Sequence, residues 1–354
     1  MKSMPSSARP RIAAVCAALA LAAFAARVRA DAYHPRPTPD VNQPTIDPSL
    51  EPYAPTGQYT GKLKAITSQT IEFTLRLWIK RFQEKQPGVT ITFEPSGGEP
   101  TAGALTAGKI DFGMITREIS PDGQQAFVRA HGYTPLAVPV CGGSIRLKSY
   151  SDVMVFIVNK DNPIDRITYS QLDAIFSGTH NRKYRIPVAT WGDIGVEGEY
   201  SNKIIHPWTI KPWDGFEEFI RQRVLAGGSF RDVIRQTDDG TRPLAAEVAA
   251  DPYAISLDSL AWVGPEVKVL SIAVDDKGPY YAPTPENIFS WKYPLNRFIY
   301  AYINREPGTP VDNPILKEFM RFILSKDGQQ CVVDDQLYFP LNAELVRKSL
   351  AKID

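Results

Sequence analysis

The chain has 354 residues, 43% hydrophobic and 22% charged, and its 40 basic and 39 acidic residues give a formal net charge of +1. This is the composition of a globular protein long enough for one large two-lobed domain. The even balance of charge argues against a protein that binds nucleic acid or other polyanions, because such proteins carry a strong basic excess. A small buried anion site stays open, since it needs only a few donors.

The N-terminus has the layout of a secretory signal peptide. A positively charged start precedes an apolar run from Ile12 to Ala25, and the small residues Val28 and Ala30 offer a cleavage site before Asp31. A membrane anchor is the alternative, but the run is shorter than the roughly 20 residues of a spanning helix. We expect residues 1–30 to be removed on export to the periplasm.

Prolines are dense in residues 31–58. Proline fixes φ and lacks a backbone N–H, so this density disfavours helices and sheet interiors and favours an extended backbone. The segment is expected to form an arm or tether ahead of the folded domain.

From Gly61 onward, short apolar strands alternate with helical patterns. The expected strands are 63–66, 89–93, 110–114, 153–159, 254–257 and 297–303. Helices are expected at 71–82, in a short stretch ending near Ala107, and at 170–176, 216–226, 242–250 and 313–325. Alternation of this kind predicts mostly parallel sheets with helices on their faces.

Polar turns follow the first two expected strands and lead into helices. In a parallel sheet, ligands bind outside the carboxyl ends of the strands, and free N–H groups at helix starts favour an anion there. Serine and threonine hydroxyls add donors, and glycines let the backbone come close. The predicted ligand residues of this part of the chain are Ser68, Gln69, Thr70, Ser96, Gly97, Gly98, Asp111 and Arg117.

Asp111 is expected to decide which anion binds. A carboxylate beside an anion is repulsive unless the anion carries a proton that the carboxylate can accept. This favours hydrogen phosphate or arsenate over fully ionised sulfate. The competing interpretations are structural: serines and threonines at helix starts are ordinary N-caps, and an Asp-x-Gly sequence often forms a turn.

In these segments the sequence resembles the phosphate-binding proteins of bacterial ABC transporters, which have the type II periplasmic binding protein fold. The matching motifs are TSQT (67–70), PSGG (95–98), AGKIDFGMITR (107–117), VMVFIVNKDNP (153–163), LDAIFSG (172–178), AAEVAADPYAIS (245–256), YPLNR (293–297), FILSKDGQQ (322–330) and YFPL (338–341). By this resemblance, Ser68, Thr70, Ser96 and Asp111 match ligand positions, and Arg117 matches an arginine that follows the Asp-x-Gly strand.

The resemblance implies an α/β fold of two lobes, each a mostly parallel sheet flanked by helices, joined by a two-strand hinge. Lobe I would comprise 59–150 and 280–354, and lobe II would comprise 151–279. The implied partners are phosphate or a related small oxyanion and the membrane permease of an ABC transporter, with the binding protein itself a monomer.

The second lobe departs from the family pattern, which supplies an arginine and then Ser-Gly-Thr at a helix start. The corresponding stretch here, 206–216, has neither. Lys211 offers a replacement charge and Thr209 a hydroxyl, while Trp213 suits an organic or sugar-like ligand as well. The alternative function is therefore a binding or sensing module of the same fold for an organic or phosphorylated ligand.

Catalysis, cofactors and metal sites find no support in the sequence. The chain has 4 histidines, and nucleophile-elbow, zinc-protease, Cys-x-x-Cys and P-loop motifs are missing. We therefore expect a binding protein and not an enzyme. Export permits a disulfide between Cys141 and Cys331, and two buried free thiols are the alternative.

Overall fold

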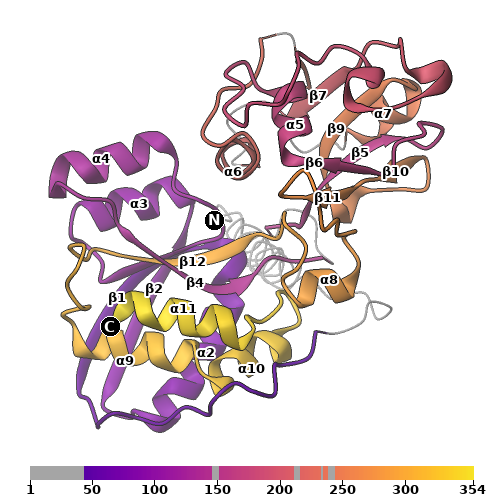
Figure 1. Cartoon of the computed structure of the whole chain (residues 1–354). Coiled ribbons are helices and arrows are strands. Elements are labelled where there is room, and N and C mark those ends of the chain that lie inside the picture. The colour runs from indigo at the N-terminus through magenta and orange to yellow at the C-terminus, as the bar shows by residue number, and fades with distance from the viewer. Residues whose placement is uncertain (1–43, 146–150, 211–215, 233, 238–243) are drawn as a thin grey trace, which may run out of the picture. The chain divides into compact units, whose positions relative to one another are not determined.

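The computed structural model describes residues 44–145, 151–210, 216–232, 234–237 and 244–354, which two five-stranded sheets organise (Figure 1). The predicted signal peptide, the first part of the proline-rich arm, and the ligand candidates Lys211 and Trp213 lie outside these residues. In the part of the chain so described, no helix has the length and apolar character needed to cross a membrane.

The first sheet has the strand order β2-β1-β3-β12-β4. Its strands are β1 (Gly61–Ser68), β2 (Val89–Ser96), β3 (Phe112–Ile115), β4 (Leu136–Gly142) and β12 (Phe298–Ile303). Strand β1 runs parallel to β2 and β3, whereas β12 runs antiparallel to both β3 and β4. The late strand β12 thus completes a sheet that the first part of the chain begins.

Helices cover both faces of the first sheet (Figure 1). On one side, α3 (Gly98–Thr106) and α4 (Pro121–His131) enclose a small apolar cluster with Leu105 and Phe127. On the other, α2 (Glu72–Lys85), α9 (Pro314–Ile323), α10 (Lys326–Asp335) and α11 (Ala343–Ile353) pack on a larger core.

The helix expected over 313–325 is α9, and a further helix that the sequence analysis did not predict, α10, follows it. The side chain of Ser325 accepts a hydrogen bond from the backbone N–H of Gly328. A serine in this position is a helix N-cap, so a new helix begins directly after α9 ends.

The second sheet has the order β10-β5-β9-β7-β8. Its strands are β5 (Met154–Asn159), β7 (His206–Ile210), β8 (Arg235–Thr237), β9 (Ala254–Ser259) and β10 (Val267–Val269). Strand β7 is parallel to β8 and β9, and β5 is antiparallel to β9 and β10. Each five-stranded sheet therefore has one strand that opposes the rest, which confirms the prediction of mostly parallel sheets in an α/β fold.

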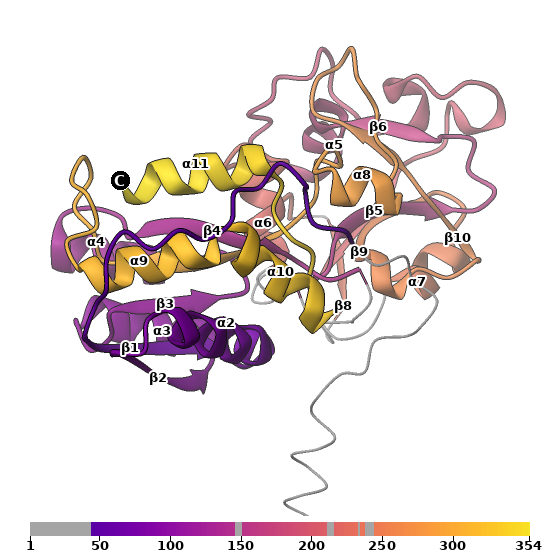
Figure 2. The same ribbon diagram turned by 90° about the horizontal axis from the view of Figure 1, so that it is seen from below.

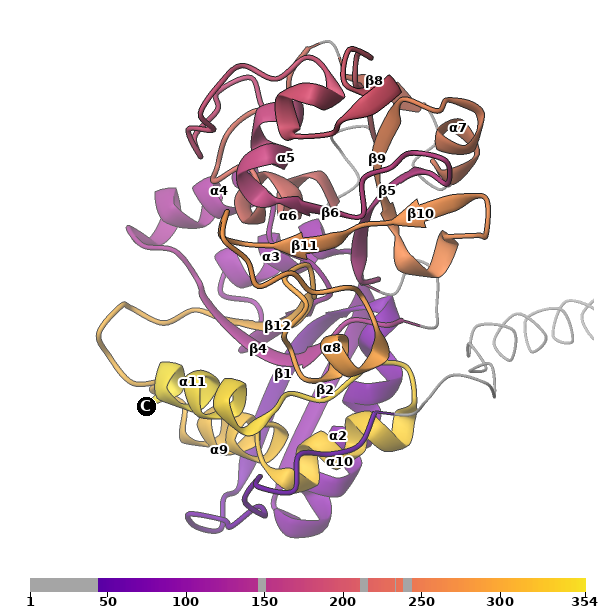
Figure 3. The ribbon, with the colours of Figure 1, turned by 45° about the vertical axis from the view of Figure 1, so that its right-hand side comes forward.

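Smaller elements surround the second sheet. A parallel pair, β6 (Arg166–Thr168) and β11 (Ser271–Ala273), lies side by side in Figure 3. The helices near this sheet are α5 (Tyr169–Phe176), α6 (Phe216–Arg223), α7 (Ala245–Ala250) and α8 (Pro285–Phe289). Among the described residues, 3-10 turns form at η1 (Gln69–Ile71), which follows β1 of the first sheet, and at η2 (Trp191–Ile194), η3 (Gly198–Tyr200) and η4 (Leu260–Trp262).

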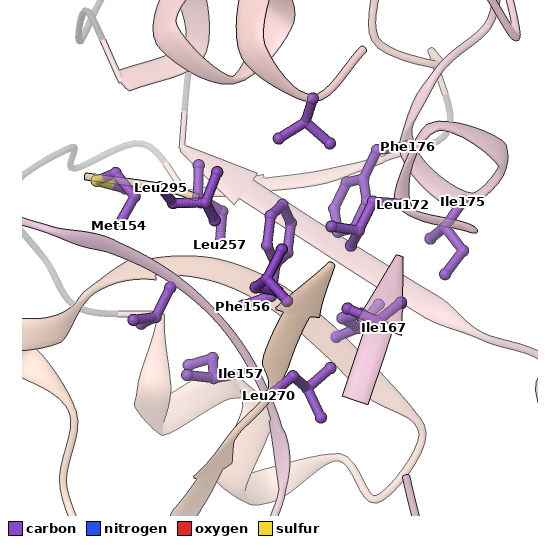
Figure 4. Packing of buried hydrophobic residues seen from close by; sticks show 14 of the residues in the cluster. Met154, Phe156, Ile157, Ile167, Leu172, Ile175, Phe176, Leu257, Leu270 and Leu295 are labelled. Carbon is purple, nitrogen blue, oxygen red and sulfur yellow. The ribbon is translucent and has the colours of Figure 1, made fainter. Parts of the chain in front are cut away.

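The core of the second sheet is centred on β5, whose six residues are all buried (Figure 4). A continuous apolar run is what a strand covered on both faces requires. Phe156 packs against Phe176 of α5 with ring centroids 5.4 Å apart. Ile288 and Leu295 belong to the same cluster, although they follow the predicted boundary at residue 279. The lobe boundaries themselves stay a prediction.

The described part of the proline-rich arm is docked on the first lobe's helices. In Figure 2 its indigo trace runs along α9 and α11. Leu50 is only 4% exposed and belongs to the core. The carboxylate of Glu318 accepts hydrogen bonds from Tyr53 Oη at 2.6 Å, Thr56 Oγ1 at 2.5 Å and the Thr56 backbone N–H at 3.1 Å. From residue 44 the arm is therefore a packed strap.

Both Cys141 and Cys331 are buried free thiols, so the disulfide is not formed. Burial raises the pKa of the Cys331 thiol to about 11.

Candidate functional site: the carboxyl edge of the first sheet

Strands β1, β2 and β3 end together at one edge of the first sheet. Ser68 is level with Ser96, and Thr67 is level with Met114. The residues that follow each strand are thereby brought to one place. This is the edge at which open α/β sheets bind ligands.

The turn after β1 is tied to the turn after β3. The hydroxyl of Thr70 donates to Thr116 Oγ1 at 3.4 Å. Thr116 also receives a hydrogen bond at its backbone oxygen from the Ser151 hydroxyl. The carbonyl of Thr70 accepts a 2.8 Å hydrogen bond from Tyr338, which fixes the β1 turn. Ser68, Gln69 and Thr70 therefore lie where the sequence analysis expected them.

Thr116 is a candidate that the sequence analysis missed. It is the first residue after β3, just as Gln69 and Gly97 are the first after β1 and β2. The sequence analysis expected this strand to end at residue 114, so it did not place Thr116 directly after the strand.

The turn after β2 offers backbone donors at the start of α3. Gly97 is the N-cap of this helix, and no side chain caps it. A Cβ on Gly98 would lie 3.3 Å from Arg117 Nε and 3.3 Å from Ile115 Cγ2. A side chain at this position would be in tight contact, and Arg117 or Ile115 would have to shift by a few tenths of an ångström. Arg117 is also 3.7 Å from the carboxylate of Glu99, so its charge is partly matched within the protein.

Asp111 does not lie at this edge, and its predicted placement is wrong. Its Oδ2 accepts a 2.7 Å hydrogen bond from the backbone N–H of Lys64, and its own N–H donates to the Lys64 carbonyl at 2.8 Å. Lys64 is four positions before Ser68, which is about 13 Å along a strand. Asp111 thus precedes β3 and joins it to β1 at the far end. Asn313, the N-cap of α9, contacts its Oδ1 at 3.5 Å.

In the second sheet, the edge at the end of β9 carries buried carboxyl groups. The hydroxyl of Ser259 donates to Asp152 Oδ2 at 2.7 Å. Asp258 accepts hydrogen bonds from the backbone N–H groups of Ala245 at 3.0 Å and Ser259 at 2.8 Å, and so covers the start of α7. Burial, with a smaller contribution from Asp152, raises the pKa of Asp258 to about 6. These carboxyl groups do not replace the arginine and the Ser-Gly-Thr sequence that the family pattern places in its second lobe.

Thr209 lies in β7 and is 2% exposed. Within the described ranges, its hydroxyl oxygen has no hydrogen-bond partner. His206, at the start of the same strand, is held by Asp251, with 2.7 Å between Nδ1 and Oδ2. No group of three or more histidine, cysteine, aspartate or glutamate side chains is arranged for a metal ion in the part of the chain that the structure describes.

Comparison with known proteins places this geometry in context. A model of the PBP superfamily domain matches residues 53–327. The phosphate-binding protein PstS of Pseudomonas aeruginosa is 30% identical over 308 residues, which cover 87% of this chain and 92% of that protein. PstS of Staphylococcus epidermidis is 26% identical over 193 residues, covering 51% of this chain and 52% of that protein.

A solved structure agrees in fold. The crystal structure of PstS from Borrelia burgdorferi superposes with a TM-score of 0.52 at 17% identity, covering 80% of this chain and 99% of that one. At this identity the likeness concerns the fold alone.

Proposed function

The chain belongs to the PBP superfamily as a PstS-like periplasmic binding protein, and we propose that it is exported and captures a small oxyanion, with phosphate first. The same proposal makes it a monomer of the periplasm that delivers its ligand to the membrane permease of an ABC-type uptake system. Binding, and not catalysis, is its function.

The observation that carries this proposal is the convergence of hydroxyls and backbone donors at the carboxyl edge of the first sheet. Ser68, Thr70, Ser96 and Thr116 come from the ends of three adjacent strands. The uncapped start of α3 adds backbone N–H groups, and Arg117 adds a permanent charge. Hydrogen bonds from such donors to an anion are charge-assisted, and each contributes about 1.5–3 kcal/mol.

Thr116, and not Asp111, lies at the end of β3 that faces the proposed site. A hydroxyl can donate to an ionised oxygen or accept the proton of hydrogen phosphate, whereas a carboxylate can only accept. A site lined with hydroxyls therefore tolerates sulfate better than a site with a carboxylate. We expect selectivity for phosphate over sulfate to be modest.

The second lobe favours a second candidate, an organic or phosphorylated ligand. A doubly charged inorganic anion gains little from an edge that carries Asp152 and Asp258. A larger ligand can place its anionic group at the first sheet and present neutral or donor groups to these carboxyls. The predicted second-lobe ligands Thr209, Lys211 and Trp213 remain part of this proposal.

Calorimetric titration of the mature protein distinguishes the two candidates. The ligands are phosphate, arsenate, sulfate, a phosphonate and a small organic phosphate. Heat with phosphate and arsenate supports the oxyanion receptor. A dissociation constant of about 1 mM is near the weak limit of specific binding. If inorganic phosphate gives no heat at that concentration and the organic phosphate does, the second candidate is supported and the oxyanion receptor is not.

A further inference from the structure

A pocket lies at the start of β7, beside His206, and Ile210 marks the other end of this strand. It has a volume of about 250 Å³. Its walls come from the segment before η2, from residues 204–207, from the end of α5 and from Arg231. Hydrogen bonds hold the walls together, since the Ile205 N–H donates to the Ala189 carbonyl at 2.9 Å and the Arg231 N–H donates to the Phe176 carbonyl at 2.9 Å. The pocket is thus built by tertiary pairing of four separate segments.

The lining is mainly aliphatic. Ile175, Val188 and Ile205 are buried, and Ala189 and Pro207 complete the wall. Ile204 also lines the pocket and is 63% exposed, the most exposed large apolar residue among those described. An isoleucine left in water beside a cavity offers apolar surface that a ligand can bury.

Two basic side chains line the same small space. Arg231 donates from Nη1 to the Ile175 carbonyl at 3.3 Å, which uses one of the five N–H donors of a guanidinium. Within the described residues, no carboxylate forms an ion pair with it. His206 is held through Nδ1 by Asp251 at 2.7 Å. In a neutral imidazole whose Nδ1 donates to a carboxylate, Nε2 is an acceptor.

We propose that this pocket is a second ligand site, for a small organic carboxylate with a branched aliphatic tail. The carboxylate accepts paired hydrogen bonds from Arg231, whose planar fork matches its geometry. The tail packs on Val188, Ile204 and Ile205. Inorganic phosphate suits the pocket poorly, because it would be desolvated against aliphatic walls without burying any apolar surface of its own.

The site is separate from the oxyanion site of the proposed function. It lies at the amino end of β7, whereas the oxyanion donors follow the carboxyl ends of β1, β2 and β3 in the other sheet. The size also sets a limit, because ligand pockets for drug-sized molecules span roughly 300–1,000 Å³. Only a small acid fits.

The test uses 3-methylbutanoate and acetate as probes, with the mature protein in phosphate-free buffer and ligand-observed saturation-transfer NMR. We expect 3-methylbutanoate to bind more tightly than acetate, by about fourfold for each carbon of the tail that is buried. Arg231→Gln should weaken binding of 3-methylbutanoate at least about tenfold, because it removes a charge-assisted contact. The matched control is Arg129→Gln, on the exposed face of α4, which should bind as the wild type does.

A second variant tests the same pocket in case Arg231→Gln does not fold. Ala189 is exposed, and its backbone groups make the structural hydrogen bonds, so Ala189→Trp should fill the pocket without disturbing them. It should abolish saturation transfer to 3-methylbutanoate while phosphate titrations stay unchanged. No transfer to wild type at about 10 mM, or equal transfer with either pocket variant, would overturn the proposal.

Discussion

The hydroxyl oxygens of Thr70 and Thr116 lie 3.4 Å apart, although 46 positions separate the two residues in the chain. This contact joins the turn after β1 to the turn after β3 at the carboxyl edge of the first sheet. The same edge carries Ser68 and Ser96, which are level with each other at the ends of β1 and β2. The first prediction tests whether an anion is bound at this place.

Thr116→Val should weaken phosphate binding by about 10- to 100-fold, because valine keeps the shape and removes a hydrogen bond to a charged group. Thr92→Val, in the middle of β2, is the matched control and should leave the affinity unchanged. Isothermal titration calorimetry measures both. A Thr116→Val protein with wild-type affinity would remove this residue from the site.

Asp111→Asn should leave the preference between phosphate and sulfate as it is in the wild type. The carboxylate accepts a hydrogen bond from the Lys64 N–H and lies at the far end of β3, so it acts on stability. We expect the free energy of unfolding to fall by about 1 kcal/mol, since an amide oxygen accepts more weakly than a carboxylate. Urea unfolding and a competition titration check the two parts. A changed anion preference would return Asp111 to the binding site.

Glu318→Ala should release the strap formed by the arm. The change removes the buried acceptor of three hydrogen bonds from the half-buried Tyr53 and the exposed Thr56. The expected loss of unfolding free energy is about 3 kcal/mol. Glu344→Ala is the control, because its ion pair with Lys348 is exposed to solvent and its removal should cost far less stability. Equal losses in the two variants would show that the strap adds no stability.

Asp258 should make the protein less stable as the pH rises from 4 to 6. Its folded pKa of about 6 lies above the ordinary 3.8, so the folded state holds this proton more tightly than the unfolded state. The stabilisation is present below pH 4 and is lost as the pH passes through the folded pKa. Relative to Asp258→Asn, the wild type should lose about 2–3 kcal/mol between pH 4 and pH 7. Urea unfolding at several pH values measures this difference, and a constant difference would contradict the raised pKa.

The thiol of Cys331 should not react with Ellman's reagent at pH 8 in the folded protein. Burial raises its pKa to about 11, so the reactive thiolate is scarce, and burial raises the pKa of Cys141 as well. Both thiols should react once the chain is unfolded in guanidinium. Lys80→Cys, at an exposed position of α2, is the positive control and should react at once. Rapid reaction of the native wild type would mean that the core around α10 opens readily.

Local patterns in the sequence predicted much of the fold. The apolar run at 153–159 indicated a strand buried on both faces, and β5 is such a strand. The strand-turn-helix order indicated the turns after β1 and β2, including Ser68 and Ser96. These features depend on side chains within a few positions of one another. They can therefore be recognised in the sequence without knowing which distant segments pack against them.

The sequence by itself determined the family, the α/β class and two of the three turns that build the candidate site. Tertiary structure alone decided the third turn, because the pairing of β3 with β1 sets Asp111 level with Lys64 and leaves Thr116 beside Thr70. Pairing also decided that Tyr53 of the arm meets Glu318 of α9. Which end of a strand meets the ligand, and which distant side chain meets which, depends on the register between segments far apart in the chain. The packing of the whole sheet sets that register, and no local pattern records it.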